Sequence, residues 1–511
     1  MASGRIIETR LFINGEFRAS SDGATFDLPS AASGELLAQG SSSFLEQTHL
    51  HLKSRQPERL PDPPSTTVYE ATAQDVDDAV TAAKAAYPAW AALSPHDRGR
   101  HLAKLADLIQ ESHAELARLE AESMGRPVSS YFDAVVGSKY FRYFSEAAYP
   151  QGSSSLNTPG FVNVTLKQPV GVVAVIIPWN VPLVLLAKKL APALAAGNAV
   201  VLKSSEKAPL TSLYVADLIS KAGFPPGVVN VLSGHGPNVG APLASHMDVR
   251  AISFTGSNRT GRLIAKMAAE SNLKNVILEL GGKSPAIIFG DADIDAAVRD
   301  TRFSIHLLSG QTCIANSRIY VHRGVAQAFL DKFRVAFAAS RMGDPTLPET
   351  THGPQADAIQ HATVLRYIEM GKEAGGTLVT ADADAADAPG FFVNPTIFVD
   401  VPEDARMMKE EIFGPVVAIN TFDTEEEAVV KANDSEYGLY AAVYTKDLDR
   451  AMRVAARLEA GTVGVNCTSP TKGDDVPFGG YKGSGLQRES YIHSMETFME
   501  TKSVLIKVAG L

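Results

Sequence analysis

Short apolar runs and helical patterns alternate along residues 170–280. The runs are rich in β-branched residues and occupy residues 170–177, 199–203, 228–232, 251–255 and 275–280. Between them, apolar residues recur at helical spacing in residues 183–195, 210–222, 239–245 and 259–271. Strands that are buried on both faces read as continuous apolar runs, so this rhythm predicts a parallel sheet with helices on both faces.

The same rhythm resumes after Ser284 and predicts a second α/β unit. Strand-like runs follow at residues 286–289, 317–321, 396–399, 416–422, 441–445 and 462–466. Two helices, over residues 73–92 and 98–124, precede both units. The predicted fold class is therefore α/β, with a parallel-sheet domain formed by residues 1–146 and 170–281 and an α/β domain formed by residues 282–480.

Two segments with alternating polar and apolar residues stand outside this rhythm. Residues 149–167 combine turn signals with an alternating run, and residues 501–508 alternate in the same way. We assign residues 147–169 and 481–511 to a β-strand arm. Strands that lack a partner in their own domain often complete a neighbouring sheet, so the arm predicts self-association.

Residues 40–67 interrupt the first domain with a polar insertion that shows no periodicity. The insertion contains proline, serine and histidine but no pattern typical of a helix or a strand. We interpret it either as a surface loop or as sequence retained from an intron, and we assign no chemistry to it.

Charge and composition exclude several classes of partner. The formal net charge is −10 and no basic tract occurs, so we expect no nucleic-acid partner. The apolar stretch at residues 170–177 is too short to span a bilayer, and residues 1–10 do not resemble a signal peptide. Two cysteines among 511 residues do not make a disulfide framework. We therefore expect a cytoplasmic protein without a membrane partner.

Three residues at the ends of predicted strands or in turns have the chemistry of a catalytic site. Cys313 closes a Ser-Gly-Gln-Thr-Cys run, where it is either a nucleophile or a small buried side chain. Asn180 follows the first strand and is either an amide donor to an oxyanion or part of an ordinary turn. Glu279 ends the fifth strand and is either a general base or a surface carboxylate.

Other strand ends carry features of a dinucleotide site. Lys203 and Glu206 follow the second strand, where a carboxylate either binds ribose hydroxyls or forms a solvated charge pair. Gly256 and Ser257 precede a helix whose exposed amides would suit a pyrophosphate. The second cysteine, Cys467, is interpreted as a packed small residue.

The joint order of these motifs resembles the aldehyde dehydrogenase superfamily, in its NAD(P)-dependent, non-acylating form. The resemblance rests on the Glu-Leu-Gly-Gly-Lys run at residues 279–283, the Gly-Gln-Thr-Cys run at 310–313 and the Glu-Ile-Phe-Gly-Pro run at 411–415. It implies that the first domain binds NAD, that the second is catalytic, and that the arm joins subunits into dimers or tetramers.

The resemblance also implies a role for each site residue. Cys313 would be the nucleophile, Glu279 the base that activates water, and Asn180 the oxyanion donor together with the Cys313 backbone N–H. The implied cofactor residues are Ile177, Trp179, Lys203, Glu206, Gly256, Ser257, Gly261, Leu280, Glu411 and Phe413. The implied substrate residues are Val181, Leu185, Lys188, Thr312 and Ile314, and no metal ligand is assigned.

The implied reaction is the oxidation of an aldehyde to a carboxylic acid through a cysteine thiohemiacetal and a thioester. NAD is the expected cofactor because the Glu206 carboxylate would repel a 2′-phosphate, while the nearby Lys203 leaves NADP as a second option. Two alternatives remain: a coenzyme A-acylating semialdehyde dehydrogenase, which would not depend on Glu279, and a catalytically silent NAD-binding structural protein.

Lys188 departs from the aromatic residue common at its position in the family. A buried lysine is costly unless it is paired, so Lys188 either reaches solvent or meets an anionic group. One hypothesis is that the anionic group belongs to a carboxylated aldehyde.

Overall fold

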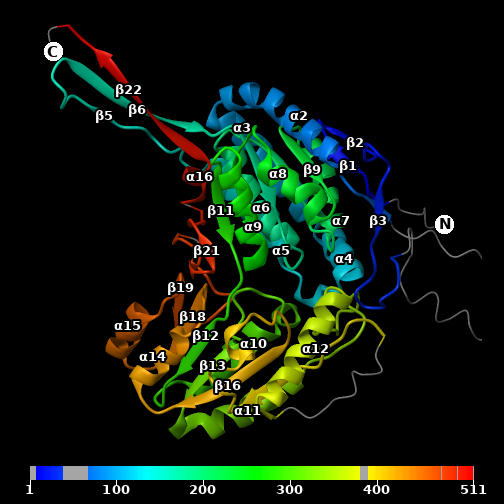
Figure 1. Ribbon diagram of the computed structural model, residues 1–511, viewed down its shortest axis with the longest axis vertical. Helices are drawn as coiled ribbons and strands as arrows, with labels where there is room; N and C mark the ends of the chain where they lie inside the picture. The colour runs from blue at the N-terminus through cyan, green and yellow to red at the C-terminus, as the bar shows by residue number, and fades with distance from the viewer. Residues whose placement is uncertain (1–6, 38–66, 380–388, 474, 492, 510–511) are drawn as a thin grey trace, which may run out of the picture.

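The computed structural model describes residues 7–37, 67–379, 389–473, 475–491 and 493–509. Two large sheets lie one above the other in Figure 1, and a narrow arm projects from the upper half. The insertion predicted at residues 40–67 lies outside the described residues except for Thr67. That residue begins β4 (Thr67–Tyr69), which pairs antiparallel with β3 (Thr25–Asp27).

The upper sheet has a core of five parallel strands. In sheet order they are β9 (Val229–Leu232), β8 (Ala199–Lys203), β7 (Val172–Ile176), β10 (Val249–Thr255) and β11 (Asn275–Glu279). The first of these strands in the sequence, β7, lies in the middle, and the chain then builds outward on both sides. The strand order therefore reverses between β7 and β10, and the carboxyl ends of these strands flank the crevice where open α/β sheets bind ligands.

Three antiparallel strands complete the edges of this sheet. They are β2 (Glu16–Arg18) and β1 (Leu11–Ile13) beside β9, and β21 (Gly485–Leu486) beside β11. The position of β21 corrects the predicted extent of the arm, because Leu486 pairs with Leu278 and Gly485 with Glu279. The segment that begins at residue 481 thus returns to the upper sheet before it enters the arm.

Helices cover both faces of the upper sheet, and side chains that alternate along the strands face them in turn. Val173, Val175 and Leu202 belong to the core on one face, whereas Val172 and Ala174 belong to the core on the other. The first core contains α3 (Pro95–Glu111), α4 (His113–Met124), α5 (Asp133–Glu146), α6 (Pro182–Ala195) and α7 (Pro209–Lys221). The second contains α2 (Ala73–Ala92), α8 (Ala241–Ser245) and α9 (Asn258–Glu270).

One predicted helix, over residues 98–124, is divided in the structure. Ser112 separates α3 from α4 with φ −88° and ψ 9°, which lies outside the helical range. The apolar pattern continues across this kink because both helices pack on the same core.

The lower sheet is also largely parallel. In sheet order its strands are β14 (Thr377–Leu378), β15 (Thr396–Val399), β16 (Val416–Phe422), β13 (Arg318–His322), β12 (Pro285–Ile288), β18 (Tyr440–Tyr444) and β19 (Thr462–Val465). On one face lie α12 (Ala358–Glu373), α13 (Arg406–Lys409), α14 (Glu425–Asn433) and α15 (Leu448–Arg457), and on the other α10 (Ile294–His306) and α11 (Ala326–Ala338). The predicted α/β class is confirmed.

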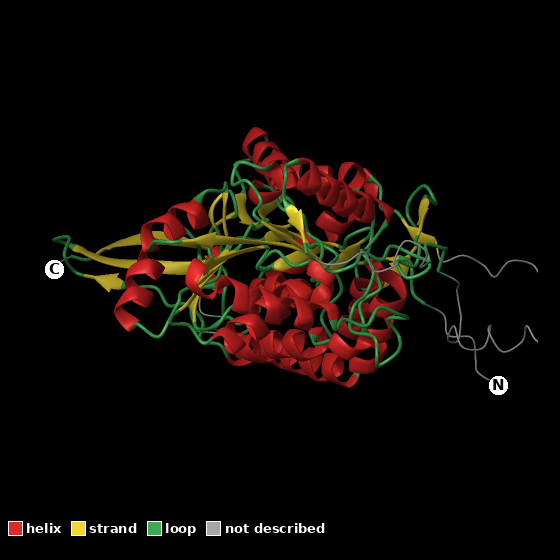
Figure 2. Cartoon of the chain, turned by 90° about the horizontal axis from the view of Figure 1, so that it is seen from below, coloured by secondary structure: helices red, strands yellow, loops and turns green. Residues whose placement is uncertain are grey.

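The arm is a three-stranded antiparallel sheet that extends away from the rest of the chain (Figure 2). It consists of β5 (Ser154–Ser155), β6 (Phe161–Pro169) and β22 (Met499–Lys507), and β22 pairs with β6 along its whole length. The short helix α16 (Ser494–Thr497) leads into β22. Among the described residues, no helix has both the length and the hydropathy needed to cross a membrane.

Candidate active site

Cys313 follows a tight turn in which two residues have a left-handed backbone conformation. In η3 (Leu307–Gly310) the residues Leu308 and Ser309 have φ of 53° and 54°, a left-handed conformation that side chains other than glycine rarely adopt. Contacts from a distant segment offset this cost. The Ser309 hydroxyl donates to the Gly353 carbonyl at 2.7 Å, and the Gln311 side chain accepts from the Ala356 N–H at 2.9 Å. The turn is therefore fixed by the segment at residues 353–356.

Glycines allow close contact between the three motifs at residues 279–283, 310–313 and 411–415. A Cβ on Gly282 would lie 2.2 Å from the Cys313 carbonyl oxygen, and one on Gly281 would lie 2.5 Å from a Glu411 carboxylate oxygen. The Gly282 N–H donates to the Glu411 Oε1 at 2.9 Å. Gly310 approaches the third motif as closely, since its Cβ would lie 2.0 Å from the Gly414 carbonyl oxygen. Segments that are far apart in the sequence thus meet through backbone contacts that any side chain would block.

The environment of Cys313 favours the neutral thiol. The side chain is partly exposed and packs with Ile314 and Phe478. Burial and the facing carboxylates of Glu411 and Glu279 raise the pKa of Cys313 to about 12, against the opposing charge of Lys188. A thiol of this kind needs a nearby base before it can attack a carbonyl.

Glu279 has the properties of such a base. It ends β11, is buried, and its Oε1 has no hydrogen-bond partner among the described residues. Burial raises the pKa of Glu279 to about 7, although Lys188 opposes this rise. A carboxylate with a pKa near neutrality can both accept and release a proton at physiological pH.

Asn180 reaches the same loop from the upper sheet. Its side chain is buried, and its Nδ2 donates to the Gln311 carbonyl at 2.9 Å. The amide carries two N–H groups, so this contact orients the side chain and leaves one donor for another acceptor. Cys313, Glu279 and Asn180 are therefore brought into one region.

Two buried lysines occupy the middle of α6 and share one carboxylate. The Nζ atoms of Lys188 and Lys189 lie 2.8 Å from the two oxygens of Glu489. Lys188 is only 4% exposed, so it does not lie at an open rim, and the anionic group that it meets is Glu489. A carboxylated aldehyde is therefore not needed to explain the burial of Lys188. The place of Lys188 among the substrate residues stays a prediction.

Lys189 and Glu489 were not found by sequence reasoning. The signal for the lysines was available, since two adjacent charges in a helix that is apolar on all sides require a buried partner. Nothing in the sequence around Glu489 marks it as that partner, because it lies 300 residues away from Lys189.

The predicted cofactor residues at the ends of β7, β8, β10 and β11 lie along one edge of the upper sheet. The Ile177 N–H donates to the Lys203 carbonyl at 3.1 Å, and the Gly256 N–H donates to the Glu279 carbonyl at 3.1 Å. Lys203 and Glu206 form an ion pair at 3.8 Å. This edge lies at the reversal of strand order described above.

The residues around the start of α9 fit a phosphate-bearing ligand. Ser257 caps the helix by accepting from the Thr260 N–H at 3.3 Å, and Gly261 packs against Leu280. The buried Thr255 Oγ1, beside this helix start, has no hydrogen-bond partner among the described residues. Free backbone amides at a helix start and a hydroxyl without a partner are the donors that a pyrophosphate requires.

Trp179, which follows β7 of the upper sheet, contacts Phe413, which precedes β16 of the lower sheet. Their rings lie edge to face with centroids 5.3 Å apart. Phe413 has φ of 60°, and its carbonyl accepts from the Gln360 side chain at 2.9 Å, which holds this turn. The Lys207 Nζ lies 5.2 Å from the Trp179 ring centre.

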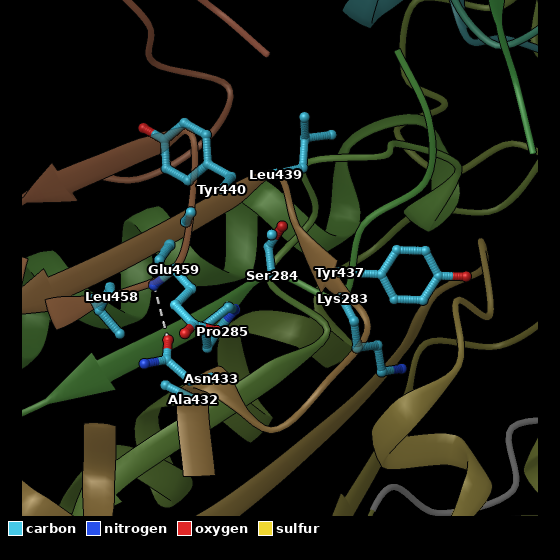
Figure 3. A pocket seen from close by; sticks show the side chains of 13 residues that line it. Lys283, Ser284, Pro285, Ala432, Asn433, Tyr437, Leu439, Tyr440, Leu458 and Glu459 are labelled. Carbon is cyan, nitrogen blue, oxygen red and sulfur yellow. Dashed lines mark hydrogen bonds between the residues drawn. The ribbon is translucent and has the colours of Figure 1, made fainter. Parts of the chain in front are cut away.

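A separate pocket lies next to Lys283, the last residue of the Glu-Leu-Gly-Gly-Lys run, and is lined by residues of β12, β17 (Tyr437–Gly438) and β18 (Figure 3). Lys283, Tyr437 and Glu459 are among its lining residues, which include none of the predicted site residues. In the described part of the chain, no group of three or more His, Cys, Asp or Glu side chains is arranged to hold a metal ion.

Comparison with known proteins agrees with this geometry. The family model described as "Aldehyde dehydrogenase family" matches residues 49–504. The chain belongs to the aldehyde dehydrogenase family. The predicted resemblance is therefore confirmed, and the enzyme class with it.

Relatives of this aldehyde dehydrogenase cover most of its length. It is 47% identical over 448 residues to a mitochondrial aldehyde dehydrogenase of Sus scrofa, an alignment that covers 86% of this chain and 85% of that protein. It is 43% identical over 506 residues to the mitochondrial aldehyde dehydrogenase of Homo sapiens, covering 98% and 92%.

Solved structures share the fold of this aldehyde dehydrogenase. One of them is PnpE from Pseudomonas sp. WBC-3. A structure of PnpE in complex with nicotinamide adenine dinucleotide has a TM-score of 0.90 and 40% identity over 99% of this chain and 98% of that one. The indole-3-acetaldehyde dehydrogenase AldA of P. syringae, solved as a mutant with NAD+ and IAA, has a TM-score of 0.90 and 38% identity over 98% and 97%.

Gly310→Ala should lower the rate of aldehyde oxidation by about 100-fold, because the added Cβ would displace the turn that carries Cys313 from Gly414. Gly375→Ala is the matched control: Gly375 also has a positive φ, of 90°, but nothing lies within 4 Å of its added Cβ. Steady-state rates and thermal unfolding of both variants check this expectation. Equal losses of activity in the two variants would contradict it.

Proposed function

We propose that this aldehyde dehydrogenase oxidises its substrate through a covalent intermediate on Cys313, with Glu279 as the base and Asn180 as the oxyanion donor. The observation that carries the proposal is the close approach of the Cys313 loop to the end of the Glu279 strand, where a Cβ on Gly282 would lie 2.2 Å from the Cys313 carbonyl oxygen. Glu279 is there a buried carboxylate whose pKa is raised to about 7. A high-pKa thiol and a near-neutral base form a matched pair for nucleophilic catalysis.

The first half of the reaction forms a thioester. Glu279 takes the thiol proton, and the Cys313 sulfur attacks the aldehyde carbon to give a thiohemiacetal. The Asn180 Nδ2–H and the Cys313 backbone N–H stabilise its oxyanion, and one such donor contributes about 2.7–4 kcal/mol. Collapse of the oxyanion expels hydride from the carbon and leaves the thioester. NAD, when bound, supplies the acceptor for this hydride.

The second half of the reaction releases the acid. Glu279 first releases the thiol proton to solvent. It then removes a proton from water, the resulting hydroxide attacks the thioester carbon, and the carbon–sulfur bond breaks as this proton passes from Glu279 to the sulfur. The products are the carboxylic acid and the regenerated thiol of Cys313. Hydrolysis by water, rather than transfer to coenzyme A, follows from the retention of a buried Glu279 beside the nucleophile.

NAD is the cofactor that we propose, with NADP as a weaker option. The donors at the start of α9 would hold the pyrophosphate, Glu206 the adenosine ribose, and Glu411 the nicotinamide ribose. Trp179 and Phe413, whose rings are in contact, would lie beside the nicotinamide, as would Ile177 and Leu280. The complex of PnpE with nicotinamide adenine dinucleotide supports this proposal.

The substrate would lie between α6 and the Cys313 loop. We propose that its site is lined by Val181 before α6, Leu185 and Lys188 in α6, and Thr312 and Ile314 beside the nucleophile. Lys188 has Glu489 as its charge partner, so the proposed site does not require an acidic substrate.

The finer predictions concern assembly and compartment. We propose that the arm joins subunits into a dimer or tetramer, supported by exposed apolar side chains on β22 such as Leu505 and Ile506. We also propose a cytoplasmic location, supported by the two free cysteines, Cys313 and Cys467. Cell fractionation distinguishes this location from the mitochondrial one of the named relatives.

Cys313→Ala should abolish NADH formation from aldehydes, whereas Glu279→Gln should slow turnover by about 10²–10⁴-fold. A stopped-flow trace of the second variant should show slower formation of the first equivalent of NADH, because Glu279 removes the thiol proton, and then slow hydrolysis of the thioester. Cys467→Ala is the matched control and should keep the wild-type rate.

Turnover that persists in Cys313→Ala would remove the proposed nucleophile. Acyl-coenzyme A formation that is unaffected by Glu279→Gln would instead indicate the acylating alternative.

Glu206→Gln should raise kcat/KM for NADP relative to NAD by about tenfold or more, because it removes a carboxylate that repels the 2′-phosphate and frees Lys203. The control is Asp217→Asn, which removes a carboxylate of similar side-chain exposure, 39% against 33%, from another lysine pair. Steady-state kinetics with both cofactors measure the ratio. An unchanged ratio in Glu206→Gln would place the ribose elsewhere.

Substitution of both Leu505 and Ile506 by lysine should dissociate the assembly, since the two side chains are 64% and 45% exposed on the arm. Ile359→Lys, at a position 74% exposed on α12, is the control and should leave the assembly intact. Sedimentation velocity at several concentrations measures the species present. An arm variant that sediments like the wild type would exclude this face from the interface.

A further inference from the structure

The lysine pair of α6 carries one more positive charge than its partner can balance. Lys188 and Lys189 both contact the single carboxylate of Glu489, and the three side chains are 4%, 0% and 3% exposed. Burial lowers the pKa of Lys188, but the charges of Glu489 and Glu279 outweigh it and raise that pKa above its ordinary value, so the ammonium stays charged. A buried excess of positive charge needs a further anion.

Glu279 is the anion near this excess, since a Cβ on Gly479, the residue after Phe478, would lie 3.1 Å from the Glu279 Oε1, and the Phe478 ring lies under Lys188. Besides Glu489, it is the carboxylate whose charge acts on Lys188. The titratable groups that act on Glu279 are Lys188 and Lys189 from α6, and Glu489 and Arg488 from the segment after β21. Burial drives the pKa of Glu279 upward, and Lys188 is the strongest influence in the opposite direction.

The same ammonium acts on the nucleophile. Lys188 Nζ lies 4.2 Å from the ring centre of Phe478, and Phe478 packs against the same small apolar cluster as Cys313. Glu411 and Glu279 disfavour the thiolate of Cys313, and Lys188 is the cation that favours it. The charge of Lys188 therefore acts on both groups that must lose a proton in the proposed reaction.

We propose that Lys188 is a positioning residue whose charge favours the ionised forms of Glu279 and Cys313. Its ion pair with Glu489 keeps that carboxylate in place. The proposal rests on the proposed function, in which these two groups react. It assigns to Lys188 a role in the chemistry, in addition to its place near the substrate.

Lys188 and Lys189 differ in what their removal would leave behind. Lys189 Nζ donates to the Ser253 hydroxyl on β10 at 2.8 Å as well as to Glu489, so it ties α6 to the sheet. After loss of Lys188, Glu489 keeps its contact with Lys189 and the buried charges of that pair still balance. Lys188→Met should therefore change the charge near Glu279 while leaving the fold in place.

Two measurements test the proposal on Lys188→Met. Loss of a positive charge makes the ionised carboxylate less favourable, so the acid limb of kcat against pH should move upward by about 1 pH unit. In cofactor-free protein at a fixed pH below the thiol pKa, the alkylation of Cys313 by iodoacetamide should slow by about tenfold, because the thiolate fraction falls.

The controls separate charge from packing. Lys188→Arg keeps the charge and should restore both values, whereas Lys139→Met removes an exposed lysine from α5 and should change neither. Cys467, whose labelled peptide is distinguished by mass spectrometry, should react at the wild-type rate throughout. Lys188→Gln replaces the methionine variant if that protein does not fold, with the same expectations.

A wild-type pH limb and alkylation rate in Lys188→Met would overturn the proposal, and so would an equal shift in Lys188→Arg. Failure of the proposed function gives a different result. Turnover would then persist in Cys313→Ala, while the alkylation rates would still report the charge of Lys188.

Discussion

The backbone contact at Gly281 and Gly282 is the constraint on which the site depends. It places the Cys313 loop and Glu411 against the end of the strand that carries Glu279, and a side chain at either glycine would separate them. The parallel sheet, the left-handed turn before Cys313 and the short antiparallel strand β21 all converge near this contact. The positions of Cys313, Glu279 and Glu411 relative to one another therefore depend on how closely these backbone segments approach.

Charge balance is the second constraint. Burial raises the pKa of Glu279 to about 7, and burial together with the carboxylates of Glu411 and Glu279 raises the pKa of Cys313 to about 12. The two lysines of α6 oppose this tendency, but only because Glu489 makes their own burial tolerable. The site thus combines burial with a fixed positive charge. Burial favours the neutral forms of Glu279 and Cys313, and the positive charge favours their loss of a proton.

Sequence patterns predicted the parts of this protein that depend on local regularity. The strand–helix alternation predicted both sheets, and the motif order predicted the family, because short runs near Glu279, Cys313 and Glu411 carry distinctive residues. The pairing of β21 with β11 was missed, since a two-residue strand has no periodicity. Glu489 was missed for a related reason: a buried carboxylate looks like a surface one until its partners are known. The kink at Ser112 was hidden by an apolar pattern that continues through it.

The turn before Cys313 has a consequence for the growing chain. Its partners lie later in the sequence: Gly353 and Ala356 fix the turn, Gly414 packs against it, and Glu489 balances the charges nearby. Domains fold as their residues leave the ribosome, so the upper sheet is largely synthesised before any of these partners exists. The turn before Cys313 therefore stays without its partners from its own synthesis until these later residues are made, and during that interval the nascent polypeptide carries the thiol without an active site around it.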